Sequence, residues 1–173
     1  INASYEAILT PPEKLKDTVK MLKSYNGFNV TIPHKEALLS LIDQPTESAK
    51  IYKAVNTVAN KQGRLLGYST DAEGFVSALE LEDIPLEGKV LILGSGGVSR
   101  TIATECAMRG CDITVAVLPT EMDRAKLLSA DLKERFIKGA TCITLGDIKG
   151  DYDLAVNGTP VGMHPNTSDS ILN

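Results

Sequence analysis

The sequence predicts an α/β protein of two domains, with a doubly wound parallel sheet in the second. Segments with a strand pattern alternate with segments with a helix pattern along the whole chain. The pattern restarts at "IPLEGK" (84–89), where we place a domain boundary near Pro85. The segment "KVLILG" (89–94) follows and is apolar after Lys89, which is typical of a strand covered on both faces, as in a parallel sheet.

The first half opens with the alternating segment "SYEAIL" (4–9), which predicts a strand. The proline-led "PPEKLKDTVKMLKS" (11–24) predicts a helix, "GFNVTI" (27–32) a strand, and the residues from about 34 to 42 a second helix. We then expect a short helix in "TESAKIYK" (46–53) with Thr46 as its N-cap. A hairpin of "AVNTVAN" (54–60) and "RLLGYST" (64–70) should follow, with Gly63 at positive φ in its turn. The last element expected in this half is a helix in "DAEGFVSALELE" (71–82).

The second half repeats a strand–helix–strand pattern. The expected strands are "KVLILG" (89–94), "DITVAV" (112–117), "TCITL" (141–145) and "YDLAVNGT" (152–159), and the expected helices are "GVSRTIATECAMRG" (97–110), ended by Gly110, and "MDRAKLLSADLKERF" (122–136). We therefore expect one domain over 1–85 and another over 86–173. The chain opens inside an alternating segment without Met and stops just after a polar loop. We expect both domains to be truncated, the first at its amino end and the second at its carboxy end.

Composition narrows the classes of partner. The 173 residues are 43% hydrophobic and 23% charged, with a formal net charge of −4. That charge argues against a nucleic-acid partner, which needs a basic surface. The longest apolar stretches fall far short of the roughly 20 residues of a membrane span, and the amino end has no signal pattern, so we expect a cytoplasmic protein without a membrane partner. The three cysteines form no C-x-x-C pair, so neither a disulfide framework nor a metal site is expected. The sequence carries no signal for an oligomeric state.

A glycine-rich turn follows the first strand of the second half. In "GSGGVS" (94–99), Gly94 permits a tight turn, and Gly96 permits a pyrophosphate to approach the N–H groups at the start of the next helix. Ser99 stands where the usual G-x-G-x-x-G fingerprint has its third glycine, and a plain strand–helix turn is the alternative. The acidic residue expected after the second strand for a ribose hydroxyl is absent from "AVLPT" (116–120). Its absence favours a cofactor with a 2′-phosphate.

Five motifs together resemble the shikimate dehydrogenase family, from Tyr5 to Met163. They are "NVTIPHK" (29–35), "AVNTV" (54–58), "GYSTDAEGF" (67–75), "GSGGVSR" (94–100) and "NGTPVGM" (157–163). The resemblance implies a substrate-binding catalytic domain followed by a Rossmann-like dinucleotide-binding domain. It implies an oxidoreductase of the shikimate pathway of aromatic amino-acid biosynthesis, which reduces the small molecule 3-dehydroshikimate to shikimate. The implied cofactor is NADP, with NAD possible.

The resemblance also implies roles for polar residues of the first half and its border. Lys35 would be the catalytic acid/base and Asp71 its partner carboxylate, both of them also binding substrate. A surface ion pair is the alternative for these two. Thr31 and Asn56 would bind substrate hydroxyls, or else only bond to the backbone at strand ends. His34 is expected to be structural and His164 a loop residue, and Glu47 is expected on a solvated helix face.

The implied cofactor-binding residues fall in three segments of the second half. They are Gly94, Ser95, Gly96, Gly97 and Val98 for the pyrophosphate, Thr120 and Arg124 for the 2′-phosphate, and Asn157, Thr159, Gly162 and Met163 near the nicotinamide.

Three departures from the family pattern stand out. Ser69 replaces the Asn of the family's "YNTD". The family's Asn-Arg-Thr, whose Arg grips the 2′-phosphate, is "VLPTEMDR" (117–124) here, so Thr120 and Arg124 are partial matches only. The family's His-Ser-x-Ser-Pro segment and Gln-bearing last helix do not lie within these residues. Two alternatives therefore remain beside the NADP enzyme: a quinate/shikimate dehydrogenase using NAD, and a dehydrogenase-like protein that binds without turnover.

Overall fold

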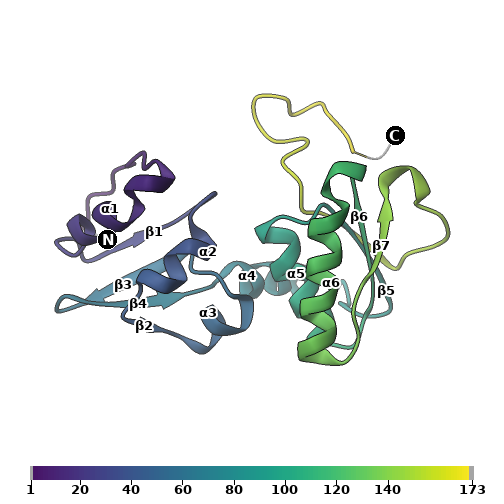
Figure 1. Ribbon diagram of the computed structural model, residues 1–173, viewed down its shortest axis with the longest axis horizontal. Coiled ribbons are helices and arrows are strands. Elements are labelled where there is room, and N and C mark those ends of the chain that lie inside the picture. The colour runs from purple at the N-terminus through teal and green to yellow at the C-terminus, as the bar shows by residue number, and fades with distance from the viewer. Residues whose placement is uncertain (1, 172–173) are drawn as a thin grey trace. The chain divides into compact units, whose positions relative to one another are not determined.

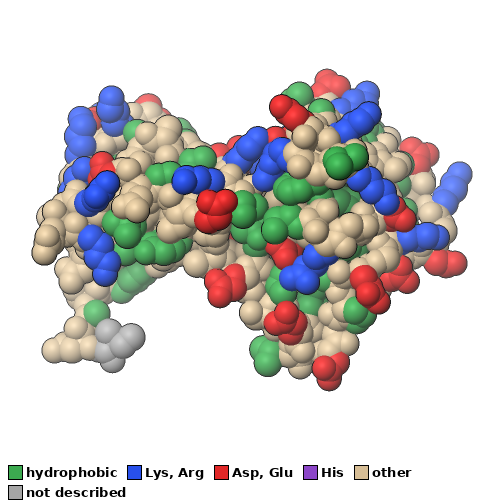
Figure 2. Space-filling view, turned by 90° about the horizontal axis from the view of Figure 1, so that it is seen from below, with side chains coloured by type: hydrophobic (Ala, Val, Ile, Leu, Met, Phe, Trp, Pro, Cys, Tyr) green, Lys and Arg blue, Asp and Glu red, His purple; other side chains and the backbone are tan. Residues whose placement is uncertain are grey.

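The chain divides into two compact units, Ile1–Thr70 and Asp71–Asn173, which are described separately below. The computed structural model describes residues 2–171. Within these residues, every helix is too short or too polar to cross a lipid bilayer. Charged side chains of both signs are interspersed over the face shown in Figure 2.

The first unit is built around a small mixed sheet. Strands β1 and β4 each pair with β3 in antiparallel fashion, and β2 pairs with β4 in parallel, so that the strand order is β1-β3-β4-β2. The elements are η1 (Pro12–Lys14), α1 (Leu15–Leu22), β1 (Gly27–Asn29), α2 (Lys35–Leu38), η2 (Leu39–Leu41), β2 (Gln44–Pro45), α3 (Glu47–Tyr52), β3 (Thr57–Lys61) and β4 (Arg64–Tyr68).

The predicted hairpin of this unit is confirmed. Gln62 and Gly63 connect β3 to β4, with φ of 56° and 87°. Two successive positive φ values are what a two-residue hairpin turn of the favoured hand requires. The Asn60 side-chain oxygen accepts a 2.7 Å hydrogen bond from the Gly63 amide, which closes the turn. The predicted N-cap is confirmed as well, since the Thr46 hydroxyl accepts from the Ala49 amide at 3.5 Å.

The core of the first unit lies between this sheet and the helices. Helix α1 contributes two residues four positions apart, Leu15 and Val19, which an α-helix places on one face. The other buried members are Leu38, Ile42, Ala49, Val55, Val58 and Leu65. Burial of these side chains is the main force that holds α2 and α3 to the sheet.

The strand expected over 4–9 is wrong, and the one expected over 27–32 is too long. Residues 2–9 are exposed and form no strand in the structure, with Leu9 98% accessible. Alternation describes which faces of a segment are apolar, but a strand also needs a neighbour to receive its hydrogen bonds. Among the described residues, β1 is paired with β3 only, and it ends at Asn29 before the turn that carries Lys35. The helix expected over 34–42 is divided into α2 and η2.

The second unit has a purely parallel sheet in the order β7-β6-β5-β8. Its elements are α4 (Asp71–Leu81), β5 (Lys89–Leu93), α5 (Gly97–Met108), β6 (Asp112–Val117), η3 (Pro119–Glu121), α6 (Met122–Phe136), β7 (Thr141–Thr144), η4 (Leu145–Asp147) and β8 (Leu154–Asn157). The predicted strands and helices of this half are confirmed, and Gly110 has φ of 77° just after α5.

Helices α5 and α6 lie side by side on one face of this sheet (Figure 1). Alternate residues of the strands, such as Val90 and Ile92, are fully buried beneath them, together with Leu128 and Leu132 of α6. The residues between, Leu91 and Leu93, form a smaller cluster on the opposite face. Burial on both faces explains why "VLIL" (90–93) is apolar throughout instead of alternating.

Helix α4 packs in the second unit, since it contacts α5 and its Phe75 lies against the larger core. The compact units therefore divide between Thr70 and Asp71. The functional boundary near Pro85 stays a prediction, because packing alone does not assign α4 to the substrate or the cofactor domain.

All three cysteines lie in the second unit. Cys106 and Cys111 are buried members of the larger core, and Cys142 is half-buried beside it. Burial raises the pKa of the Cys106 thiol to about 12 and raises the pKa of Cys111 and Cys142 as well. These thiols therefore remain protonated at neutral pH and act as small apolar side chains.

Candidate active site and cofactor turn

The first unit brings together three of the residues expected to bind substrate. The Val30 amide donates to the Asn56 carbonyl at 2.8 Å, which places the residue before Thr31 beside Asn56. The Val55 amide donates to the Lys35 carbonyl, also at 2.8 Å. Two backbone hydrogen bonds thus hold the "TIPHK" turn against the "AVN" segment. Thr31, Lys35 and Asn56 consequently lie in one neighbourhood at the end of β1 and the start of β3.

A tight turn presents Lys35 at the first position of α2. The His34 amide donates to the Thr31 carbonyl at 3.0 Å, which closes the turn. His34 Nε2 lies 2.7 Å from the Thr10 carbonyl oxygen and donates to it, so this nitrogen carries a proton. The imidazole therefore anchors the turn to the segment before α1. This contact agrees with the structural role expected for His34.

Asn56 is itself fixed by Thr70. Its Nδ2 donates to Thr70 Oγ1 at 3.0 Å, and its Oδ1 accepts from the Thr70 amide at 3.0 Å. Thr70 was not among the predicted site residues, although it stands inside the "STD" motif. The pair ties the start of β3 to the end of β4. Its neighbour Ser69 is 3% exposed, and its hydroxyl has no hydrogen-bond partner among the described residues.

Asp71 begins α4 as the first residue of the second unit, whereas Lys35 belongs to the first. Each is placed within its own unit. The pairing of the two side chains therefore stays a prediction.

The glycine turn has the geometry that a pyrophosphate requires. Gly94 has φ of +93°, and its amide donates to the Ala116 carbonyl of β6 at 2.8 Å. Gly96 is the N-cap of α5, and no side chain caps the free N–H groups of this 12-residue helix. A Cβ on Gly96 would meet no atom within 4 Å. Open space thus lies over uncapped amides at the carboxyl edge of the sheet, which fits a bound phosphate.

The loop from 157 to 163 lies at the same edge, because Asn157 pairs in register with Leu93, just before the glycine turn. Its side chains bond mainly to the loop itself. Asn157 Oδ1 accepts from the Thr159 amide at 3.0 Å, and Asn157 Nδ2 donates to the Val161 carbonyl at 2.9 Å. Asn157 and Thr159 therefore shape this loop, and the exposed Met163 at its end is available to a ligand.

The remaining predicted cofactor residues also lie at this edge. Thr120 and Arg124 follow β6, whose end neighbours the end of β5, and both are exposed. Val98 is partly exposed in the first turn of α5. Ser95 is 1% exposed, and its hydroxyl has no hydrogen-bond partner within the described residues. Its side chain therefore points away from solvent, and its backbone is the part that a phosphate can reach.

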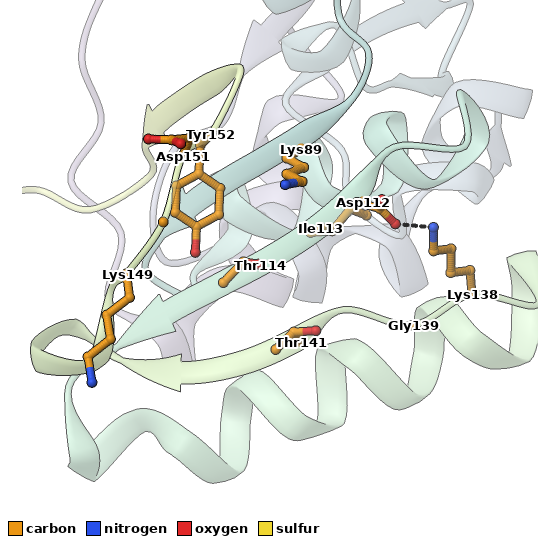
Figure 3. A pocket seen from close by; sticks show the side chains of 11 residues that line it. Lys89, Asp112, Ile113, Thr114, Lys138, Gly139, Thr141, Lys149, Asp151 and Tyr152 are labelled. Atoms are coloured by element: carbon orange, nitrogen blue, oxygen red, sulfur yellow. Dashed lines mark hydrogen bonds and ion pairs between the residues drawn. The ribbon is translucent and has the colours of Figure 1, made fainter.

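A pocket of the second unit lies away from this edge. It has a volume of about 350 Å³ and surrounds the starts of β5, β6 and β7, where Lys89, Asp112 and Thr141 stand (Figure 3). Asp112 is hydrogen-bonded to Lys138, which lowers the pKa of the Asp112 carboxyl. Most of the side chains that line the pocket are exposed. Parallel α/β sheets bind ligands at the carboxyl ends of their strands. The glycine turn is therefore a better candidate for the cofactor site than this pocket.

Known proteins are similar to this chain over nearly its whole length. Residues 1–58 match the family model of the shikimate dehydrogenase substrate binding domain. The NADP(+) shikimate dehydrogenase of Caldanaerobacter subterraneus subsp. tengcongensis is 36% identical over 174 residues, which cover 98% of this chain and 62% of that protein. This chain thus spans about three fifths of the length of such relatives.

Two solved structures are similar to this chain in fold and sequence. Shikimate 5-dehydrogenase from Thermus thermophilus, in complex with NADP(H) and shikimate, is 34% identical with a TM-score of 0.80, covering 95% of this chain and 59% of that one. The enzyme from Listeria monocytogenes, in complex with shikimate and NAD, is 26% identical with a TM-score of 0.82, covering 95% and 61%. The Rossmann-like α/β fold expected from the sequence is confirmed.

Proposed function

We propose that this chain belongs to the shikimate dehydrogenase family, and that it carries the catalytic and cofactor residues of an NADPH-dependent reductase of 3-dehydroshikimate. The observation that carries the proposal is the neighbourhood of Thr31, Lys35 and Asn56, which two backbone hydrogen bonds hold together in the first unit.

Reduction of a ketone requires hydride at the carbon and a proton on the oxygen. NADPH, when bound, supplies the hydride. Lys35 donates the proton from its ammonium group to the carbonyl oxygen, since it is the acid at the head of α2. Asp71, the carboxylate of the "STD" motif, binds a substrate hydroxyl. Thr31 and Asn56 bind the remaining hydroxyls and so fix the face of the ketone that reacts.

On the cofactor side, the uncapped start of α5 and the backbone of Gly94, Gly96 and Gly97 hold the pyrophosphate. The 157–163 loop, with Gly162 and Met163, lies beside the nicotinamide ring. Arg124 and Thr120 contact the 2′-phosphate, as exposed residues at the carboxyl edge of the sheet. The cytoplasmic location and the lack of a nucleic-acid partner stay predictions from composition.

A second candidate is an NAD-linked shikimate or quinate dehydrogenase. It is favoured by Leu118 and Pro119, which stand where the family carries its phosphate-binding Arg segment, and by the NAD complex of the Listeria relative. Neither side chain can make the bidentate contact of a guanidinium with phosphate.

The test is a spectrophotometric assay of a protein of the relatives' full length that contains these residues. Shikimate and quinate are each supplied with NADP and with NAD. We expect the highest kcat/KM with shikimate and NADP. A preference for NAD would support the second candidate, and cofactor binding without turnover of either substrate would indicate a binding protein. Asp71→Asn should lower kcat without weakening cofactor binding.

A further inference from the structure

Ser99 stands in the first turn of α5, where the usual dinucleotide fingerprint has its third glycine. The residue is 0% exposed, and its hydroxyl donates to the carbonyl of Gly158 at 3.4 Å. Gly158 belongs to the other cofactor loop, 157–163. One buried side chain therefore connects two segments that are about sixty residues apart in the sequence.

Packing carries most of this contact, since 3.4 Å is long for a hydrogen bond from a hydroxyl. A Cβ on Gly158 would lie 2.3 Å from Ser99 Oγ and 3.2 Å from Ser99 Cβ. On its other side, the Gly158 amide donates to the Leu93 carbonyl at 3.0 Å. The Gly158 backbone is thus held between the end of β5 and the first turn of α5.

A second contact joins the same two segments. A Cβ on Gly94 would lie 2.7 Å from Thr159 Cγ2 and 3.4 Å from Ser99 Oγ. The glycine turn and the 157–163 loop therefore interlock around Ser99, with Gly94 and Gly158 providing the room for it. A glycine in place of Ser99 would leave this space empty.

We propose that Ser99 is a positioning residue that keeps the 157–163 loop in register with the glycine turn. The inference rests on the proposed function, in which the turn holds the pyrophosphate and the loop lies beside the nicotinamide. A dinucleotide that contacts both the glycine turn and the 157–163 loop requires a fixed distance between these two segments. When the loop shifts, the nicotinamide shifts relative to the substrate, and hydride transfer is sensitive to displacements of about 1 Å.

The first test needs no ligand. The amides of Thr159 and Val161 are hydrogen-bonded to side chains inside the loop, so their hydrogen exchange reports its opening. In Ser99→Ala we expect their exchange to become roughly threefold to tenfold faster. The matched control is Thr101→Ala on the same helix, which removes a buried hydroxyl that bonds to Gly97 in the helix itself. Both changes raise helix propensity, so faster exchange in Ser99→Ala alone comes from the loop contact.

The second test measures kinetics in a protein of the relatives' full length. Ser99→Ala should lower kcat by about tenfold while the affinity for 2′,5′-ADP, which lacks the nicotinamide, stays unchanged. Thr101→Ala should change neither quantity.

Each outcome decides a separate point. Equal exchange in the Ser99→Ala and Thr101→Ala proteins overturns the proposal, and so does a normal kcat in Ser99→Ala. A protein that shows the Ser99-dependent exchange but binds neither NADP nor NAD supports the contact and refutes the function on which its use rests.

Discussion

The methyl group of Thr159 occupies the space that a side chain on Gly94 would need, because a Cβ on Gly94 would lie 2.7 Å from Thr159 Cγ2. Gly94 also has φ of +93°, a conformation that residues with a Cβ rarely adopt. Two positions later, Gly96 has φ of −72°, and its Cβ would meet open space. Two glycines of one turn are therefore required for different reasons.

We expect Gly94→Ala to lower the free energy of unfolding by about 1–2 kcal/mol or more, because it forces a Cβ into a left-handed conformation and against Thr159. Gly96→Ala should leave stability nearly unchanged but weaken NADP binding by at least about tenfold, since its methyl group blocks the approach of a phosphate. Urea unfolding and NADP titration of both variants check this. Normal NADP affinity in Gly96→Ala would mean that the pyrophosphate lies elsewhere.

Lys35→Ala should lower kcat by roughly 10² to 10⁴, because it removes the acid that protonates the substrate oxygen. NADPH affinity should barely change, since the cofactor residues belong to the second unit. The measurement is turnover beside a cofactor titration. Lys50→Ala, which removes an exposed lysine of α3, is the control and should behave as wild type. If Lys35 only formed a surface ion pair, its loss would change stability by about 0–1 kcal/mol and leave turnover intact.

Arg124→Ala should narrow the preference for NADP over NAD, measured as the ratio of the two kcat/KM values. The reason is that a cation at the carboxyl edge of the sheet favours the cofactor with the additional phosphate. Lys126→Ala removes the same charge from an exposed position two residues further along α6 and should leave the ratio unchanged. An unaltered ratio in Arg124→Ala would show that this side chain does not touch the 2′-phosphate.

Acid should destabilise the first unit through Asp43. The Leu65 amide donates to its carboxylate at 2.9 Å and Lys23 Nζ lies 3.3 Å away, and these contacts lower the pKa of Asp43. The stabilisation is complete above the unfolded-state pKa of about 3.9 and is lost as the pH falls through the lower folded-state pKa. Asp43→Asn should flatten the change in urea midpoint between neutral and acidic pH. Lys23→Gln should flatten it less, because the Leu65 hydrogen bond is the larger cause.

The pattern of apolar residues predicted helices and strands correctly where burial of one or both faces determines the local structure. Apolar residues four apart predicted α1, and the apolar run "VLIL" (90–93) predicted a strand of the parallel sheet, because burial of a face restricts it to apolar residues. The wrong strand over 4–9 shows the limit of this reasoning. Alternation records a preference, but a strand forms only where another backbone is available for pairing.

The candidate site was likewise predicted only in part. The motifs located Lys35, Asn56 and the glycine turn. The structure places Lys35 at the start of α2, Asn56 just before β3, and the glycine turn just after β5. The partners that fix these residues came only from the fold: Thr70 for Asn56, Thr10 for His34 and Gly158 for Ser99. Each such contact joins residues 14 or more positions apart, and no local pattern encodes a distance across the fold.

The buried cysteines allow the opening of the second unit to be measured by chemical labelling. All three thiols belong to it, and Cys106 and Cys111 lie in its core with raised pKa values, so an alkylating reagent can modify those two only after the core has opened. The labelling rate of these two thiols, followed by mass spectrometry, therefore measures the opening of this unit alone. A ligand that binds the glycine turn should slow that labelling, and one that binds only the first unit should leave it unchanged.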